Sequence, residues 1–433
     1  MATPLPAASL SSETTQTIAR RLTESNRAYA EAFPGESGRR QPVQVIYGGA
    51  HLYRVGTAAK LGSLALASLQ QFAPDAGSLA RVLDWRFAPA MAEGIYARVV
   101  EKLCREPIED LRIDFEDGYG VRSDAEEDGH AVAAAEAVAA GMAAHSLPPY
   151  IGIRTKGFAQ ESYARAVRTL DLFLTTLVGK TGGELPPNFV ITYPKAAIPE
   201  QVTALADLLD QFENVLALPA RSLRFELMIE TAESILVLRD LLRASRGRML
   251  AAHFGAYDYT ASCHITAAYQ DMLHPACDFA RSMMQAAYAS TGVWVSDGAT
   301  NVLPVGRDPG AVHRAWKLHY DHIRHSLACG FYQSWDLHPA QLPVRYAAVY
   351  AFFLEGLAAA GERLRNFMEK AAQATTVGSV FDDAATGQGL LNYFLRAIDC
   401  GAITRAEAER ESGLTLDELR SGSFGAILQA RAR

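Results

Sequence analysis

The stretch LRIDFEDGYG, residues 111–120, joins an alternating strand pattern to a pair of adjacent carboxylates. Apolar residues occupy every second position from 111 to 115, so the predicted strand has one apolar face and one charged face. Glu116 and Asp117 follow where this strand ends, directly before a glycine. Taken alone, the pattern fits either a solvent-facing edge strand or one wall of a functional site, and the rest of the chain has to decide between them.

Short apolar strands recur along the chain and alternate with stretches of helical periodicity. The predicted strands are 43–50, 111–116, 150–154, 188–195, 223–230, 249–258, 292–298 and 331–339. The predicted helices between them are 57–106 (broken near Pro74 and Pro89), 124–145, 160–178, 198–213, 232–245, 278–290 and 309–329. Strands that alternate with helices form parallel βαβ units, and eight such units close into a barrel. The sequence therefore predicts an α/β fold, a (β/α)8 TIM barrel.

Helical segments flank the predicted barrel at both ends. The pattern divides the chain into an N-terminal helical segment at 1–40, a barrel domain at 41–343 and a C-terminal helical extension at 344–433. The extension contains AAVYAFFLEGLAAA, residues 347–360, which is apolar over more than one helical face. Such a helix buries against more than one surface, so we expect it to pack on the barrel or on a neighbouring subunit of a homo-oligomer.

The composition narrows the classes of function. The chain has 433 residues, 49% hydrophobic and 21% charged, and its formal net charge of −7 argues against nucleic acid as a partner. The first residues show no secretory signal, and no apolar run reaches the ~20 residues of a membrane-spanning helix. Five scattered cysteines without a CxxC pair favour neither a disulfide framework nor a zinc site. We therefore expect a cytoplasmic protein that binds neither nucleic acid nor membrane.

An ionisable residue lies at the C-terminal end of seven of the eight predicted strands. In a barrel of this type, the active site forms at that end of the strands. In strand order the residues are Glu116 with Asp117, Arg154, Lys195, Glu230, Asp258, Asp297 and His338. Ionisable residues at so many equivalent positions indicate a charged pocket. For Glu116 and Asp117, this favours the wall of a functional site over an edge strand.

The carboxylates of this set suit a hard divalent cation. Mg²⁺ prefers oxygen ligands and typically uses one or two protein carboxylates, with water and substrate completing its coordination. Glu230 and Asp258 end consecutive strands and are the predicted ligands of Mg²⁺, with Mn²⁺ as the alternative ion. Glu116 and Asp117 are predicted to hold the waters of the ion. Arg154 suits a carboxylate-bearing substrate, because guanidinium and carboxylate pair in bidentate fashion.

The other strand-end residues each leave two interpretations open. Lys195 either takes part in catalysis or pairs with a neighbouring carboxylate. Asp297 is either a site residue or an acid of a plain loop, and His338 is either catalytic or a structural histidine that bonds to the loop. The general base is equally open, since Asp114, Asp297, His338 or a metal-bound hydroxide could serve.

Six motifs carry a family resemblance. In chain order they are IDFEDG (113–118), IGIR (151–154), YPK (193–195), MIET (228–231), FGAYDYT (254–260) and WDLHPAQL (335–342). Their order and spacing resemble the citrate lyase β-subunit-like group, the HpcH/HpaI aldolase/citrate lyase family of the phosphoenolpyruvate/pyruvate-binding barrel superfamily. The resemblance implies that Glu230 and Asp258 bind Mg²⁺ and that Arg154 binds the substrate carboxylate. It also implies that Glu116 and Asp117 lie near the metal.

The resemblance implies a Mg²⁺-dependent lyase or aldolase that makes or breaks a carbon–carbon bond through a metal-stabilised enolate. Its substrate would be a 2-oxo or hydroxy carboxylic acid or its CoA thioester, and its assembly a trimer or hexamer. The chain departs from the family at Gln44, near the place of a common arginine, and in its longer first connection and larger helical tail. These departures point to a large variant of unassigned reaction. The alternatives are a phosphoryl-transfer or thioester-hydrolysing enzyme of the superfamily, or a non-catalytic binding protein on this barrel.

Overall fold

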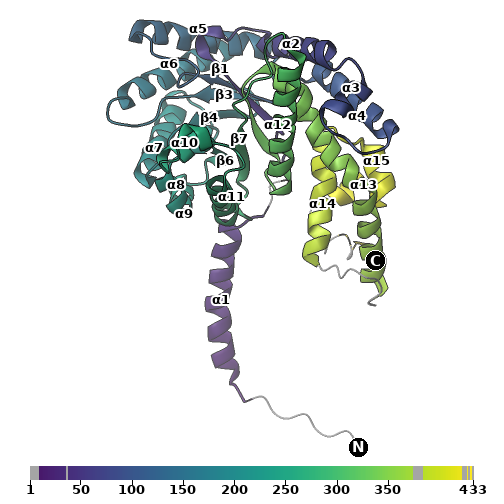
Figure 1. The fold of residues 1–433 in the computed structure, drawn as a ribbon. Helices are drawn as coiled ribbons and strands as arrows, with labels where there is room; N and C mark the ends of the chain where they lie inside the picture. The colour runs from purple at the N-terminus through teal and green to yellow at the C-terminus, as the bar shows by residue number, and fades with distance from the viewer. Residues whose placement is uncertain (1–8, 36–37, 374–383, 422–426, 428–429, 432–433) are drawn as a thin grey trace, which may run out of the picture.

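Eight parallel strands form a closed barrel in a computed structural model that describes residues 9–35, 38–373, 384–421, 427, 430 and 431 (Figure 1). Each strand pairs with the next one along the chain, and the last pairs with the first. The strands are β1 (Gln44–Gly49), β2 (Asp110–Asp114), β3 (Tyr150–Arg154), β4 (Phe189–Tyr193), β5 (Arg224–Ile229), β6 (Met249–Phe254), β7 (Trp294–Ala299) and β8 (Gln333–Asp336). The predicted (β/α)8 TIM barrel is confirmed.

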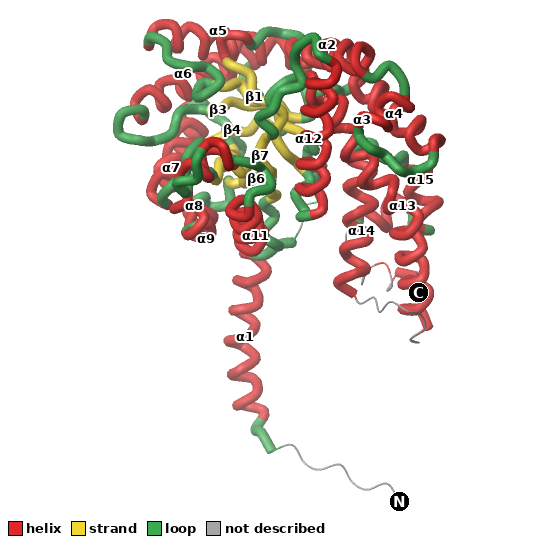
Figure 2. The backbone as a smooth tube through the Cα atoms, viewed as in Figure 1, coloured by secondary structure: helices red, strands yellow, loops and turns green. Residues whose placement is uncertain are grey.

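Helices enclose the strands on the outside of the barrel, as Figure 2 shows. They are α2 (Thr57–Phe72), α3 (Ala76–Val82), α4 (Pro89–Arg105), α5 (Asp124–Ala143), α6 (Tyr163–Thr181), α7 (Pro199–Val215), α8 (Ala232–Leu236), α9 (Leu238–Ala244), α10 (Ala256–Ser262), α11 (Pro275–Tyr288) and α12 (Pro309–Ala328). The long first connection breaks at the predicted prolines, because Pro74 follows the end of α2 and Pro89 opens α4.

Several predicted elements have different bounds in the structure, and two of these differences change the element to which residues belong. The strand predicted at 249–258 stops at Phe254, and Asp258 instead lies in the first turn of α10. Small and aromatic residues after Phe254 fit either a strand or a helix, so the apolar pattern overran the true end of the strand. The helix predicted at 232–245 is divided into α8 and α9, which meet at Val237.

The charged face of β2 points into the barrel and is buried. Arg112 is 1% exposed, and its Nε lies 3.2 Å from Glu226 Oε1 on β5. Its Nη1 lies 3.0 Å from Asp110 Oδ1, and the Tyr47 hydroxyl donates to Glu226 Oε1 at 3.0 Å. The edge-strand alternative for residues 111–116 is therefore wrong. The alternation reflects a polar barrel interior on one side of β2 and packed helices on the other.

Further helices follow the barrel and lie beside it (Figure 1). They are α13 (Leu342–Gln373), α14 (Ala384–Asp399), α15 (Arg405–Ser412) and α16 (Leu416–Arg420). α13 packs against α4 and α12 of the barrel and against α14 and α15. Among the described residues, the stretch Pro339–Glu369 is long and apolar enough to cross a membrane, but 61% of its most apolar window is buried. This burial fits a core helix.

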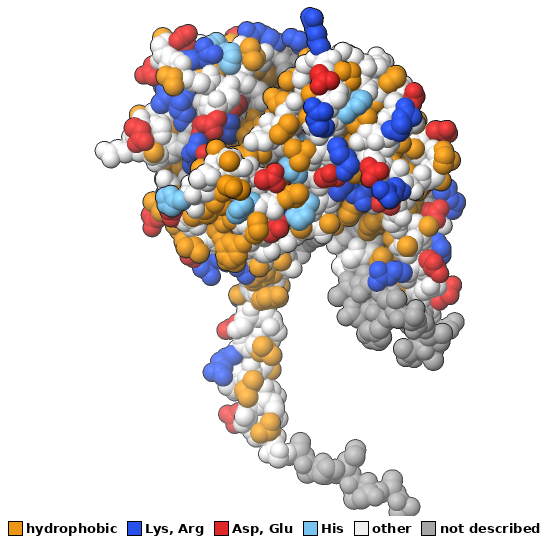
Figure 3. Space-filling view, viewed as in Figure 1, with side chains coloured by type: hydrophobic (Ala, Val, Ile, Leu, Met, Phe, Trp, Pro, Cys, Tyr) orange, Lys and Arg blue, Asp and Glu red, His pale blue; other side chains and the backbone are white. Residues whose placement is uncertain are grey.

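The N-terminal helix α1 (Ser12–Ala32) projects away from the barrel, and none of its residues is buried (Figures 1 and 3). Its C-terminal end is anchored, because the Arg239 guanidinium lies 4.7 Å from the centre of the Phe33 ring. Its large exposed apolar side chains recur at helical spacing and include Ile18, Leu22 and Tyr29. Most helices in proteins owe their stability to packing, so this face is suited to contact with another surface.

Candidate active site

Five charged side chains from the ends of β2 to β5 meet at the C-terminal mouth of the barrel. The Lys195 ammonium bonds to the Glu116 carboxylate and lies 3.4 Å from Asp117 Oδ1. Arg154 Nη1 lies 3.2 Å from the second oxygen of Glu116. The Lys195 backbone N–H donates to Glu230 Oε1 at 2.7 Å. Glu116 therefore lies between two cations at the centre of the predicted site.

Arg154 is held rigidly below this group. Its Nε and Nη2 donate to the two carboxylate oxygens of Asp114 at 2.7 and 2.5 Å. Its guanidinium carbon lies 4.8 Å from the centre of the Tyr47 ring and 5.5 Å from that of Trp335. Burial lowers the pKa of Arg154, but Asp114 and Glu116 are the main groups that oppose this effect, and the pKa is raised. Arg154 is thus a fixed cation whose Nη1 faces the mouth.

Asp114 shapes the site in a way that the sequence did not show. Besides pairing with Arg154, it accepts hydrogen bonds from the backbone N–H groups of Glu116 at 3.0 Å and Gly118 at 2.8 Å. A Cβ at Gly118 would lie 2.5 Å from Asp114 Oδ2, so glycine is required for this turn. With both oxygens occupied, Asp114 positions Arg154 and the 115–118 loop, which disfavours it as the general base.

Lys195 is a stable cation of the site. Its φ of 51° lies in the left-handed region, which non-glycine residues rarely adopt. This conformation directs its N–H to Glu230 while its ammonium reaches Glu116. Burial lowers the pKa of Lys195, but the neighbouring carboxylates of Glu116, Asp117 and Glu230 together outweigh this effect, so the pKa is raised. A base or Schiff-base role needs a neutral amine, and the geometry therefore favours the ion-pairing alternative.

Glu230 is buried directly after β5 and faces the start of α10. Burial raises the pKa of Glu230 to about 8, and repulsion from Asp258 adds to this effect, while the neighbouring cations oppose it. A Cβ at Gly255 would lie 2.5 Å from Glu230 Oε2, so the glycine makes room for the carboxyl group. A buried carboxylate of this kind is stabilised by a bound cation.

The donor chemistry of Glu230 and Asp258 fits Mg²⁺. Within the described part of the chain, Glu230 Oε1 accepts the Lys195 N–H, whereas Oε2 accepts no hydrogen bond and lies over Gly255. Asp258 is exposed in the first turn of α10 and adds a carboxylate from the adjacent strand end. Oxygen ligands that leave room for water match the preference of Mg²⁺. The residues present fit the ion, and its binding stays a prediction.

The structure places Asp297 away from this group. Asp297 is fully buried, accepts from Arg281 Nε at 2.8 Å and accepts from the Ser326 hydroxyl at 2.5 Å. These partners belong to α11 and α12, so the side chain faces the helical layer and not the mouth. The strand β7 continues to Ala299, beyond its predicted end, and its pleat turns Asp297 outward. The prediction that Asp297 lines the pocket is therefore wrong.

His338 follows β8 and takes part in local structure. Its Nδ1 accepts a hydrogen bond from the Ala340 backbone N–H at 3.1 Å and caps the short helix Pro339–Gln341. Burial lowers the pKa of His338, which keeps this nitrogen available as an acceptor. The geometry favours the structural alternative for His338 and gives no contact with Glu116, Arg154 or Lys195 among the described residues.

A neutral aromatic layer lies inside the barrel beneath Arg154. The His253 ring lies 5.8 Å from that of Tyr47 and 5.7 Å from that of Trp335, measured between ring centres. Burial lowers the pKa of His253 to about 4, and neither ring nitrogen has a hydrogen-bond partner among the described residues. This layer excludes water from the underside of the site. In the sequence, this layer was indicated by aromatic residues at the positions of β1 and β8 that face the barrel interior.

Comparisons with known proteins agree with the architecture. A family model described as Domain of unknown function (DUF6986) matches residues 22–427. No curated protein matches the chain. A citrate lyase from Burkholderia xenovorans LB400 has a TM-score of 0.56 and 20% identity, covering 86% of this chain and 97% of that chain. A malate synthase from Haloferax volcanii has a TM-score of 0.49 and 15% identity, covering 87% and 99%.

The protein CitE from Mycobacterium tuberculosis, in complex with magnesium and acetoacetate, has a TM-score of 0.41 and 15% identity, covering 71% of this chain and 89% of that chain. At such identities a likeness shows the fold alone, and this chain shares its barrel fold with the citrate lyase from Burkholderia xenovorans LB400. The family model, in contrast, spans nearly the whole chain. The protein belongs to the DUF6986 family.

Proposed function

We propose that this protein is a Mg²⁺-dependent carbon–carbon lyase or aldolase acting on a 2-oxo or hydroxy carboxylic acid or its CoA thioester. The observation that carries the proposal is the buried Glu230 carboxylate, whose unbonded Oε2 lies over Gly255 at the barrel mouth next to the start of α10. The motifs around Glu230 and Asp258 support it, because they resemble those of the citrate lyase β-subunit-like group.

Cations of the chain would orient the substrate. Arg154 offers Nη1 to a carboxylate, because its Nε and Nη2 are already bonded to Asp114. Lys195 offers a second positive group from the other side of Glu116. Glu230 and Asp258 would hold Mg²⁺, which when bound would act as a Lewis acid towards the negative charge that develops on substrate oxygens. The neutral layer under Arg154 keeps water from this side of the reacting atoms.

Glu116 is the group that we assign to proton transfer. It lies between the two cations, where a substrate carboxylate would bind, so substrate binding has to displace it from at least one of them. Burial raises the pKa of Glu116 and the neighbouring Asp117 adds to this effect, while Arg154 and Lys195 lower it. Once displaced from these cations, Glu116 would take up a proton more readily, as an acid–base group must.

The proposal is tested by assays on oxaloacetate, malyl-CoA and citramalyl-CoA with Mg²⁺ and with a chelator. We expect carbon–carbon cleavage of one of these substrate classes, dependent on Mg²⁺. Glu230→Gln and Asp258→Asn should abolish most of it, since each removes one metal ligand. Glu200→Gln is a matched control, because Glu200 is an exposed acid in the first turn of α7, after another barrel strand.

The same assays separate the alternatives. Release of free CoA without carbon–carbon cleavage would favour a thioester hydrolase on this barrel. Binding of these acids without turnover would favour the non-catalytic alternative. Cleavage that persists with the chelator, or that survives in both metal-ligand variants, would refute the proposed mechanism.

A further inference from the structure

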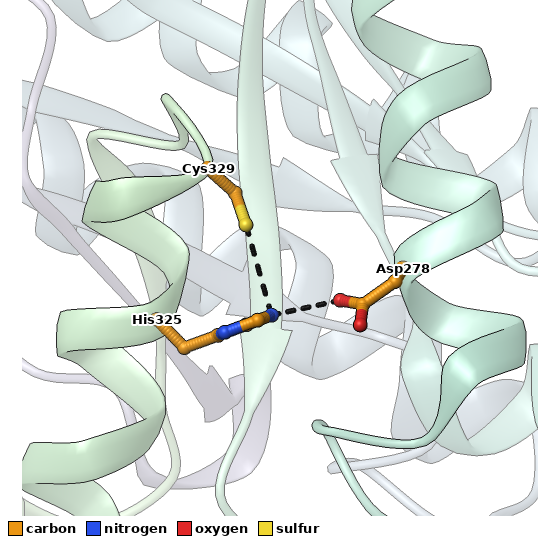
Figure 4. A group of neighbouring side chains, drawn as sticks. All are labelled: Asp278, His325 and Cys329. Carbon is orange, nitrogen blue, oxygen red and sulfur yellow. Dashed lines mark hydrogen bonds and ion pairs between the residues drawn. The ribbon is translucent and has the colours of Figure 1, made fainter.

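A second group of metal-ligating side chains lies on the outside of the barrel, between α11 and α12. Asp278 belongs to the first turn of α11, His325 to the last turn of α12, and Cys329 caps the end of α12. One ligand atom from each residue lies within 4.8 Å of the other two. Figure 4 shows the three side chains pointing toward one another from the two helices.

One of the ligand distances is close to that of a tetrahedral zinc site, and another is shorter. With Zn–S of about 2.3 Å and Zn–N of about 2.0 Å, tetrahedral ligands place sulfur and nitrogen about 3.5 Å apart. Cys329 Sγ and His325 Nε2 are 3.7 Å apart. Asp278 Oδ1 is 2.7 Å from His325 Nε2, compared with about 3.4 Å for an oxygen and a nitrogen on one zinc ion. A small outward shift of the half-exposed Asp278 side chain would complete the arrangement.

The pattern of contacts fits a shared ion better than a nucleophile. In a Cys–His–Asp triad, one ring nitrogen faces the thiol and the other faces the carboxylate. Here both Cys329 and Asp278 approach the same nitrogen, Nε2 of His325. Ligand atoms that converge in this way suit a metal ion, and neither the thiol nor the carboxylate approaches Nδ1, as a proton relay through the ring would require.

The surrounding residues hold the ligands in place. Arg281 Nη1 donates to Asp278 Oδ1 at 2.8 Å, and Arg281 is itself fixed by Asp297 at 2.8 Å and by the Met272 carbonyl at 2.6 Å. Ligating carboxylates in metal sites are commonly oriented by such hydrogen bonds. The i, i+4 spacing of His325 and Cys329 places both on one side of the helix end.

We propose that Asp278, His325 and Cys329 form a site for Zn²⁺ or a similar thiophilic divalent ion, with water as the fourth ligand. Thiolate and imidazole ligands select zinc over magnesium, so this site differs in chemistry from the carboxylates of Glu230 and Asp258. The bound ion links α11 to α12, the two helices that flank β7, and stabilises the folded state. The proposal is independent of the proposed lyase function.

Cobalt titration of the full-length protein tests the site directly. Co²⁺ bound to a thiolate gives a sulfur-to-metal charge-transfer band in the near ultraviolet. We expect this band to saturate at one ion per chain, to be competed away by Zn²⁺ and to be lost in Cys329→Ser. Cys263→Ser is the matched control, because Cys263 is also a partly exposed free thiol, and it should keep the band. Glu230→Gln should keep it too, which separates this proposal from the proposed lyase.

A second measurement needs no substitution. Zn²⁺ should protect Cys329 from alkylation in the parent protein, while the exposed Cys104 stays reactive, as mapped by peptide mass spectrometry. Asp278→Asn should weaken both the protection and the cobalt band while the protein remains folded. The proposal is overturned if no thiolate band forms, if the band survives Cys329→Ser, or if Zn²⁺ leaves alkylation of Cys329 unchanged.

Discussion

The substitution Glu230→Gln tests the electrostatics of the barrel mouth. Burial and Asp258 raise the pKa of Glu230 to about 8 from an ordinary 4.5. The folded state therefore holds this proton more tightly than the unfolded state does. Its contribution to stability is fully present below pH 4.5 and is lost as the pH rises through 8. At about 1.4 kcal/mol per decade, the loss is on the order of 5 kcal/mol.

Glutamine keeps an oxygen that can accept the Lys195 N–H, but it cannot ionise. The variant should therefore lack the loss of unfolding free energy that the parent shows between about pH 4.5 and pH 8. Near pH 5 the two proteins should have similar stability, and near pH 9 the variant should be the more stable. Mg²⁺ should remove this difference at pH 9, because it binds the ionised carboxylate of the folded parent and has no equivalent ligand in the variant.

The measurement is urea unfolding followed by tryptophan fluorescence at pH 5 and pH 9, with Mg²⁺ and with a chelator. Glu200→Gln serves as the control, since it removes one exposed carboxylate and should follow the parent at both pH values. If Glu230→Gln and the parent lose the same stability between the two pH values, the buried charge is not at Glu230. If Mg²⁺ stabilises both equally, the metal site lies elsewhere.

Three further predictions concern Asp258, Arg154 and the exposed apolar face of α1. Asp258→Asn should weaken Mg²⁺ binding in calorimetry, and an unchanged titration would mean that the ion binds elsewhere. Arg154→Ala should lower the free energy of unfolding by about 3–5 kcal/mol, because it leaves the buried carboxylate of Asp114 without its positively charged partner. A loss below about 1 kcal/mol in urea would contradict that pairing. The double substitution Ile18→Asp, Leu22→Asp should shift the proposed homo-oligomer toward the monomer, as measured by light scattering. Gln16→Asp is the control, because Gln16 lies on the opposite side of α1, and it should leave the assembly unchanged. If the parent protein is itself a monomer, the proposed assembly is wrong.

The barrel could be predicted because its signals are local. Each strand is a short apolar run between helical stretches, and the alternation of the two along the chain defines the topology of parallel strands. The same logic located Glu116, Arg154, Lys195 and Glu230, since residues that follow parallel strands must emerge at one end of a barrel. Their contacts with one another in the structure are the consequence of that topology.

Position along a strand does not settle which way a side chain points. Asp297 and Arg154 both lie near the ends of predicted strands, yet Arg154 faces the interior and Asp297 faces α11 and α12. The two cases differ in their place on the pleat, because successive side chains of a strand point to opposite faces. Asp297 lies inside β7 in the prediction and in the structure alike, so nearness to the strand end did not reveal which face it occupies.

Contacts between helices are still harder to predict from a sequence than the direction of a side chain on a strand. The spacing of His325 and Cys329 is visible in the chain, but Asp278 comes from the preceding helix, and nothing local pairs it with them. What joins the three is the packing of α11 and α12 on the outside of β7, where Arg281 bonds to both Asp278 and Asp297. The outward turn of Asp297 thus removes a carboxylate from the mouth and anchors the arginine that orients Asp278. The outward direction of Asp297 on β7 therefore explains why this residue was wrongly assigned to the mouth and how Arg281 is held beside the proposed zinc site.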